Sequence, residues 1–566
     1  MNKSRINKIW KEIYGENQIN LLDDFFADLD DFKKNNSIKN SAENWYKDVV
    51  VYSLYVDLFN NDFSGLEEKL DYISELGISC LWLLPILDSP MRDAGFDIRD
   101  YKKIRADLLK DKNQSKAFED FIGKAHSKGI KVIFDIAINH SSEEHEWFQK
   151  AKSSKDNAYR DYYIWSETKD KYSDARIIFK GMEDSNWKQH GEEYYFHRFF
   201  DFQPDLNYRN PKVLIEMTDN FLYWIKLGVD GFRADAIPYL WKEEGTDCEN
   251  LDKTHLIVKF FRAVFDYLNP NILLLAEAAQ RPKEVVKYFG DGDECHAAYH
   301  FPLMPQIFKA IAAEDSNPII STLSEKITPK IPDKSQWFIF LRCHDELSLE
   351  DVYVNEKDRE FLYKEYCKSE QWDFREGQGI SARLSELLDR NPDKIALAFS
   401  IMLSLPGTPV VYYGDEYGKL NDVEYYRDSI QKTGKKDSRF LVRGKVNWSE
   451  LEKNLKQKNS FNSQVYSKVK TLIKSRLKTK AFGRGEIVWI NLKPLLAAKT
   501  ENILAFKRIY KDEEFLIINN LSNSQISLDI ELTLSTDLLG NTLLKENRKL
   551  IIEPFAYYWI DFSKTK

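Results

Sequence analysis

Several features that would place this chain of 566 residues in other protein classes are missing. Its five cysteines are far apart, odd in number and without a CxxC pair, so neither a disulfide framework nor a structural zinc site is expected. No run of about 18 apolar residues occurs, and the N-terminus has no apolar signal-peptide core. These absences favour a cytoplasmic protein that does not bind a membrane.

An excess of positive charge is also lacking. Lys and Arg number 82 against 90 Asp and Glu, which gives a net charge of −8. Nucleic acids and anionic membranes need a basic face, so neither is an expected partner. Aromatic residues make up 14% of the chain and can stack on sugar rings, although core packing explains such a content more readily.

What the chain does contain is a repeated unit of helix, glycine and strand. Residues 64–77 place Leu66, Leu70, Ile73 and Leu76 on one helical face, after which Gly77 ends the helix and an apolar strand follows. The same cycle recurs at 115–140 and 211–236, and further strands fit 49–56, 271–278, 297–301, 337–346 and 408–416. Eight such strands predict an α/β fold, a (β/α)8 TIM barrel.

Two segments interrupt this rhythm. Residues 141–205 are too long for one βα crossover and are interpreted as an inserted domain B after the third strand. From about 500 onward, short alternating segments at 513–521, 525–532 and 548–562 predict a C-terminal all-β sandwich. The expected domains are a helical extension (1–44), the barrel (45–140 and 206–495), the insertion (141–205) and the sandwich (496–566).

Polar residues cluster where the predicted barrel strands end. They are Asp135, Asn139 and His140 on one strand, Arg233 and Asp235 on the next, then Glu277, and finally His344 and Asp345. Barrel active sites lie at this rim because the strand ends converge there. Asp415 and Glu416, after the last strand, are expected to stabilise a loop instead.

A pair of these residues has the chemistry of glycoside cleavage with retention, which needs two carboxyl groups roughly 5–5.5 Å apart. Asp235 and Glu277 end neighbouring predicted strands, so this separation is available. Arg233 points the same way as Asp235 and is expected to lower the pKa of that carboxyl. Asp345, beside His344, could grip sugar hydroxyls and stabilise an oxocarbenium-like transition state.

Four sequence motifs carry a resemblance to a known family. FDIAINH (134–140), GFRADA (231–236), LLAEA (274–278) and RCHDE (342–346) are similar to the core motifs of the α-amylase family, glycoside hydrolase family 13. The match in order and spacing extends from about 45 to 560. It implies a catalytic barrel, an inserted domain B and a C-terminal domain C, in agreement with the organisation above.

The resemblance also implies roles for individual residues. Asp235 would be the nucleophile, Glu277 the general acid/base and Asp345 the transition-state stabiliser. The residues expected to bind substrate are Asp97, His140, Arg233, His344, Phe96, which stands where the family usually has Tyr, and Gln203, in the stretch QPDLN. QPDLN resembles the signature of the oligo-1,6-glucosidase subgroup, which takes short substrates.

Within that subgroup, stretches at 175–179, 194–207, 288–308 and 344–350 are similar to maltose–trehalose isomerases, the trehalose synthase group. The small Ala236 after the predicted nucleophile favours α-1,4 links, so maltose or a short maltooligosaccharide is the predicted substrate. The family's calcium loop is shortened here to NNDFSG (60–65), so no cofactor or metal is expected, with calcium as the single metal left open.

Two alternatives stay open. An α-1,4-glucosidase or small amylase would pass the same intermediate to water, and residues 417–446 differ from the usual trehalose-synthase sequence on the leaving-group side. A binding protein without activity could use the same fold, although such relatives generally lose the catalytic carboxylates that this chain retains.

Overall fold

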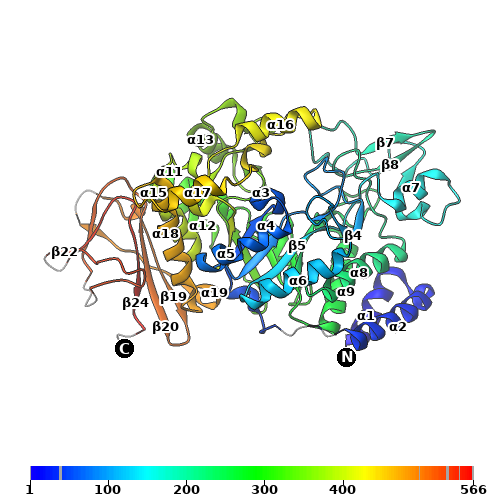
Figure 1. Ribbon diagram of the computed structural model, residues 1–566, viewed down its shortest axis with the longest axis horizontal. Helices are drawn as coiled ribbons and strands as arrows, with labels where there is room; N and C mark the ends of the chain where they lie inside the picture. Colours follow the sequence, from blue (N-terminus) through cyan, green and yellow to red (C-terminus); the bar gives the residue numbers. More distant parts are fainter. Residues whose placement is uncertain are drawn as a thin grey trace.

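The computed structural model describes residues 2–36, 38, 41–495, 498–530, 535–546 and 549–563, and its centre is a closed barrel of parallel strands (Figure 1). The barrel runs in the order β1-β16-β12-β11-β10-β9-β5-β2. Its strands are β1 (Val51–Leu54), β2 (Cys80–Leu83), β5 (Lys131–Ala137), β9 (Gly231–Asp235), β10 (Leu273–Ala276), β11 (Ala297–Tyr299), β12 (Gln336–Phe340) and β16 (Thr408–Tyr412). All eight predicted strands are present, and the predicted (β/α)8 fold is confirmed.

The helices around the barrel bury the faces that the sequence predicts. Leu66 of α4 (Phe63–Glu68) and Leu70, Ile73 and Leu76 of α5 (Leu70–Leu76) are all buried. Gly77 ends α5 in the left-handed region at a φ of 97°, and a Cβ there would lie 3.0 Å from the Ile473 side chain. Glycine therefore serves both the backbone turn and the close approach of a neighbouring helix.

The other α-helices on which the barrel and its loops depend follow in chain order. They are α3 (Val56–Asn60), α6 (Gln114–Ser127), α8 (Pro211–Lys226), α9 (Asp252–Leu268), α10 (Pro282–Val285), α11 (Leu303–Ala313), α12 (Asn317–Thr322), α13 (Glu356–Tyr366), α14 (Leu384–Leu387), α15 (Pro392–Ser404), α16 (Val423–Thr433), α17 (Trp448–Leu455), α18 (Phe461–Arg476) and α19 (Ala481–Arg484). Short strands also pair outside the barrel, namely β3 (Leu87–Asp88) with β4 (Asp100–Ile104), and β13 (Leu347–Ser348) with β15 (Gly379–Ile380) and β14 (Asp373–Phe374).

The stretch between β5 and α8 contains a small sheet of its own. After α7 (Glu146–Ser153), strands β6 (Trp165–Ser166), β7 (Trp187–His190) and β8 (Glu193–Phe196) pair in the order β6-β8-β7. In Figure 1 this sheet stands apart from the barrel, on the side away from the C-terminal strands. The exact boundaries between domains remain predictions.

The C-terminal part forms two antiparallel sheets. The first has the order β17-β19-β20-β24 and the second β18-β21-β23-β22. Their strands are β17 (Glu486–Trp489), β18 (Pro494–Leu495), β19 (Ile503–Tyr510), β20 (Glu513–Asn520), β21 (Ile526–Leu528), β22 (Lys545–Glu546), β23 (Lys549–Ile552) and β24 (Tyr557–Asp561). Residues 531, 532 and 548 of the predicted strands lie outside the described residues.

The N-terminal extension consists of two helices, α1 (Asn2–Tyr14) and α2 (Ile19–Asn35), which lie beside α9 (Figure 1). Trp10 contacts Phe260 with ring centroids 5.7 Å apart, and Arg5 Nη1 binds Asp266 Oδ2 at 2.7 Å. All five cysteines are free thiols. Among the described residues, no helix has both the length and the apolar character to cross a bilayer.

Candidate active site

The two predicted catalytic carboxyl groups lie side by side at the C-terminal rim of the barrel. Asp235 is the last residue of β9 and Glu277 follows β10, and the register pairs Ala276 of β10 with Ala234 of β9. Arg233 Nη1 pairs with Asp235 and its Nη2 pairs with Glu277, so one guanidinium holds both carboxyl groups. This arrangement fits the roughly 5–5.5 Å separation of a retaining enzyme better than the about 6.5–9.5 Å of an inverting one.

Arg233 connects the carboxylates of three neighbouring strands. Its Nη1 lies 2.7 Å from Asp235 Oδ1 and 2.9 Å from Asp135 Oδ1, and its Nη2 pairs with Glu277 Oε1. Burial lowers the pKa of Arg233, but the charges of Glu277, Asp135 and Asp235 outweigh this effect and raise it well above its ordinary value. The guanidinium therefore stays charged and leaves Asp235 Oδ2 outside its ion pair.

The net pKa shift of Asp235 differs from the expectation. Burial, followed by the negative charge of Glu277, raises the pKa of Asp235 well above its ordinary value, and the opposing effect of Arg233 is smaller. The expectation that Arg233 sets a low pKa is therefore wrong for the net shift. The physical reason is that burial and the neighbouring negative charge together disfavour the ionised form of Asp235 more than Arg233 favours it.

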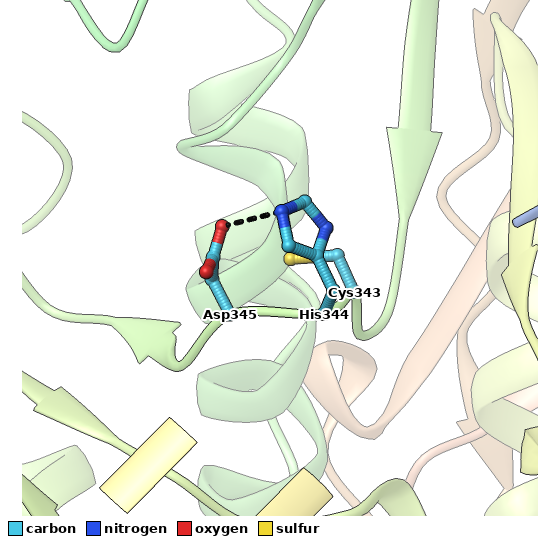
Figure 2. Close-up of side chains that lie close together, drawn as sticks. All are labelled: Cys343, His344 and Asp345. Carbon is cyan, nitrogen blue, oxygen red and sulfur yellow. Dashed lines mark ion pairs between the residues drawn. The ribbon is translucent and has the colours of Figure 1, made fainter. Parts of the chain in front are cut away.

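Asp345 lies in a more positive environment than this pair. Arg443 Nη2 is 2.9 Å and Arg439 Nη1 is 3.2 Å from its Oδ1, and His344 Nε2 is 3.1 Å from its Oδ2 (Figure 2). Burial lowers the pKa of His344 to about 3, so this imidazole is neutral near pH 7. Burial raises the pKa of Asp345, but the positive charges outweigh it, and the two arginines hold the carboxylate ionised.

Arg439 and Arg443 are functional candidates that the sequence analysis missed. Both lie in the segment 417–446, at and just after the 3-10 turn Ser438–Val442. The segment had been noted only for differing from related sequences. Its arginines were a usable signal, since a third rim carboxylate needs cationic partners when it is buried.

The group Cys343, His344 and Asp345 brings three possible metal-binding atoms within 4.8 Å of one another (Figure 2). Burial raises the pKa of the Cys343 thiol to about 12, so the thiolate that a metal would need is disfavoured. Asp345 is already paired with two guanidinium groups, which would repel a cation. The donor set does not fit a metal, and calcium elsewhere remains a prediction.

Four of the six predicted substrate-binding residues, Phe96, His140, Arg233 and His344, lie around the catalytic group. The Phe96 ring stacks on His344 with centroids 5.7 Å apart, and the Arg233 guanidinium lies 5.5 Å from the centre of the same ring. His140 contacts Phe199 of the inserted segment at 5.1 Å. These aromatic contacts leave one face of the site apolar, as a pyranose ring requires.

The other two predicted substrate-binding residues, Asp97 and Gln203, form hydrogen bonds with other residues of the protein. Asp97 is fully buried and accepts hydrogen bonds from Ser89 Oγ at 2.8 Å and from the Arg92 amide at 3.0 Å. Gln203 is also buried, and its Nε2 donates to Asp93 Oδ2 at 3.0 Å. Both side chains support the loop 89–97, which carries Phe96 to His344.

Two tyrosines at strand ends were not predicted. The hydroxyl groups of Tyr55 and Tyr299 are buried and have no hydrogen-bond partner among the described residues. The Tyr299 ring stacks on Trp82 at 5.7 Å, and Trp82 Nε1 donates to Asp135 Oδ2 at 3.0 Å. A buried polar atom without a partner is costly, so these hydroxyl groups are candidates to bind sugar. Their place at the C-terminal ends of β1 and β11 was the available signal.

Residues 175–179 of the inserted segment, here called the strap, contact segments that follow two different barrel strands, β9 and β12. At one end Arg176 Nε binds Glu249 Oε1 at 2.7 Å, in the loop after β9. At the other end Arg375 Nη2 donates to the carbonyl of Ile178 at 2.9 Å. Glu249 also accepts a hydrogen bond at 2.9 Å from Gln280, which is three residues beyond Glu277. The strap is thus tied to loops on two sides of the catalytic pair.

Comparison with known proteins agrees with this geometry. The family description "Alpha amylase, catalytic domain" matches residues 30–485. The chain belongs to the α-amylase family. It is an α-amylase-family glycoside hydrolase or transglucosylase, and the predicted resemblance is confirmed.

Among curated proteins, the chain is similar to members of the trehalose synthase group. It is 47% identical to "Trehalose synthase/amylase TreS" of Mycolicibacterium smegmatis, over 69% of this chain and 66% of that protein. It is 40% identical to the Mycobacterium tuberculosis protein of the same name, over 86% of this chain and 84% of that one. It is 38% identical to "Trehalose synthase" of Pimelobacter sp., over 86% and 89%.

Solved structures show the same fold. The α-amylase from H. orenii superposes with a TM-score of 0.70 at 25% identity, covering 91% of this chain and 99% of that one. The trehalulose synthase MutB from Pseudomonas mesoacidophila superposes with a TM-score of 0.68 at 22% identity, with the same coverage.

Proposed function

We propose that this enzyme isomerises maltose to trehalose by transfer through a covalent glucosyl ester on Asp235. Oδ2 of Asp235, the oxygen outside the Arg233 ion pair, attacks the anomeric carbon of the non-reducing glucose. Glu277, as the general acid, gives a proton to the glycosidic oxygen, and the C1–O4 bond breaks. Asp345, held ionised by Arg439 and Arg443, stabilises the positive charge that develops on the ring.

The second half of the reaction reverses these roles. The released glucose turns so that its anomeric hydroxyl faces the ester, and Glu277 takes the proton from that hydroxyl. The new C1–O1 bond forms as Asp235 leaves, and both displacements together retain the α configuration. Tyr55, Tyr299, His140, His344 and Phe96 hold the transferred glucose. The five free cysteines fit a reducing cytoplasm as the place of this reaction.

The single observation that carries transfer over hydrolysis is the strap at residues 175–179. Isomerisation requires that free glucose stay in place and that water stay out. The ties from Arg176 to Glu249 and from Arg375 to Ile178 support such a cover. The relatives whose names include "trehalose synthase" support the same assignment.

The second candidate is hydrolysis of maltose or short α-1,4-glucans by the same intermediate. It is favoured by the solvent exposure of Glu277 and Asp345, whose side chains are 21% and 28% accessible. Two of the relatives described above also carry "amylase" in their names. A binding protein without activity is disfavoured because Asp235, Glu277 and Asp345 are all arranged for chemistry.

The deciding experiment incubates the enzyme with maltose and separates the sugars by chromatography. We expect trehalose as the main product with little glucose. Arg176→Gln should raise the glucose share severalfold because the strap loses one tie, whereas Lys169→Gln, on the exposed surface of the same insertion, should not. Glucose as the main product of the unmodified enzyme would establish the hydrolase instead.

A further inference from the structure

A groove with a cavity volume of about 610 Å³ lies at the C-terminal rim, next to the catalytic pair. The segments that follow β10, β11 and β12 line it. Tyr353 separates the groove from the active site: it lines the groove, its ring stacks on Phe301 at 5.6 Å, and burial and the charges of Glu350 and Glu277 raise its pKa. The groove is therefore close to the site but has its own walls.

The groove carries positive charge that the protein itself does not neutralise. Arg281, Lys283 and Lys326 line it, and none of the three forms an ion pair or side-chain hydrogen bond with a described residue. The two acids in the groove are already engaged. Asp358 pairs with Lys309 at 2.6 Å, and Asp315 accepts from the amide and the side chain of Asn317, both at 2.8 Å.

Arg281, Lys283 and Lys326 line one cavity although the chain as a whole has a net charge of −8. Free guanidinium and ammonium groups beside a cavity bind phosphate or carboxylate oxygens through charge-assisted hydrogen bonds. A neutral glucan would not need them, and the residues proposed for catalysis offer no free cation, because Arg233, Arg439 and Arg443 are all paired with carboxylates.

Apolar side chains also line the groove, together with polar ones such as Gln306 and Asn355. The apolar ones include Pro282, Pro302, Ile327 and Tyr353, and the Ile327 side chain is 40% exposed, which is high for a large apolar residue. Apolar and aromatic surfaces of this kind pack against the C–H faces of a pyranose ring. Pyranose-binding walls beside free cations match a sugar that carries an anionic group.

We propose that this groove is a second binding site, specific for a phosphorylated sugar, and separate from the Asp235–Glu277 centre. The phosphate is held by Arg281, Lys283 and Lys326, and the sugar ring lies against the apolar walls. The site does not depend on the isomerase assignment, since no catalytic residue contributes to it.

The test is calorimetric titration of the full chain carrying Asp235→Asn, so that turnover does not interfere. We expect glucose 6-phosphate to bind with at least about tenfold lower Kd than glucose or inorganic phosphate, because only glucose 6-phosphate contacts both the cations and the apolar side chains. Its binding should weaken as the salt concentration is raised. The triple variant Arg281→Gln, Lys283→Gln, Lys326→Gln should lose this binding.

A matched control removes three exposed lysines elsewhere, as Lys453→Gln, Lys456→Gln, Lys458→Gln, and should bind glucose 6-phosphate normally. Equal binding of inorganic phosphate and glucose 6-phosphate would overturn the sugar specificity. Binding that survives in the triple variant, or equally tight binding of maltotriose, would overturn the proposal as a whole. Because all six replaced residues are exposed, loss of folding does not confound the comparison.

Discussion

Two groups of buried arginines differ in what compensates their buried positive charge. At the catalytic rim, Arg233 and Arg443 face carboxylates. Despite burial, the charges of Glu277, Asp135 and Asp235 raise the pKa of Arg233, and Tyr55, followed by Asp345 and Asp437, raises that of Arg443. Where the barrel meets the C-terminal sheets, burial lowers the pKa of Arg476 to about 9 and that of Arg508 well below its ordinary value. Nearby carboxylates make the difference.

The junction arginines bind backbone oxygens. Arg508 donates to the carbonyls of Ser404 at 2.6 Å, Phe482 at 2.9 Å and Gly485 at 2.8 Å, and Arg476 donates to Gly407 at 2.6 Å. The bond from Arg508 to Ser404, together with one from Arg476 to the Leu403 carbonyl, caps the C-terminus of α15, and the others bind carbonyls of neighbouring segments. The comparison shows two uses of a buried arginine. Where backbone carbonyls accept its hydrogen bonds, the arginine stabilises the fold. Where carboxylates and unpartnered hydroxyl groups surround it, the arginine belongs to the candidate active site.

The largest effect is expected at the catalytic rim. Asp235→Asn should lower kcat for maltose by roughly four orders of magnitude or more, because no ester can form. The raised pKa of Asp235 means that its burial costs stability as pH rises above the ordinary value of 3.8. At neutral pH, the Asp235→Asn variant should therefore have a Tm no lower than that of the unmodified enzyme. A large fall in the Tm of this variant would contradict this account.

Replacing an arginine between the barrel and the C-terminal sheets should lower stability and leave kcat unchanged. Arg508→Met leaves several buried carbonyls without a donor and should lower the free energy of unfolding by about 3 kcal/mol or more, with kcat unchanged in the protein that remains folded. Chemical denaturation measures the first quantity and the maltose assay the second. Lys507→Met, on the same strand but partly exposed, should change stability little; equal losses in both variants would remove the distinction.

A smaller effect tests the unpartnered hydroxyl groups. Tyr299→Phe should leave stability unchanged or improve it by about 1 kcal/mol, while kcat/KM falls roughly tenfold because a sugar contact is lost. Tyr208→Phe is the control, since the Tyr208 hydroxyl donates to the Ile138 carbonyl at 2.6 Å and its removal should cost stability. Unchanged kcat/KM in Tyr299→Phe would show that this hydroxyl does not meet the substrate.

The smallest expected effect concerns pH. Burial lowers the pKa of His140 to about 4 and that of His344 to about 3, so both are neutral between about pH 5 and pH 8. The acid limb of the kcat/KM profile should come from Asp235, because the raised pKa of this carboxyl means that it loses its proton only above its ordinary range. His344→Gln should lower kcat/KM at every pH without changing the shape of the profile. If the acid limb disappeared in that variant, the limb would belong to His344 instead.

Much of the site could be predicted because its residues follow strands. Asp235, Glu277, Asp345, Arg233, His140 and His344 each lie at or just beyond the C-terminal end of a barrel strand, and the closed barrel brings these ends together. Asp97 and Gln203 lie in loops, and the structure uses both within the protein. Their predicted contacts with substrate were carried over by resemblance, which does not determine where a loop side chain points.

Other parts of the site depended on segments that are distant in sequence. Arg439 and Arg443 reach Asp345 from almost 100 residues further along the chain. The strap at 175–179 meets Glu249 and Arg375 only after the insertion has folded onto the barrel. Local patterns of charge or hydropathy in the sequence do not predict such long-range contacts.

The sequence by itself determined the eight strands and the candidate catalytic carboxylates, because period, capping glycines and strand-end polarity are local properties. Only the tertiary structure decided the raised pKa of Asp235, the charge on Asp345 and the contacts of the strap with the barrel loops. Each of these depends on distances between side chains from different strands and loops, and on how much water is removed from around them.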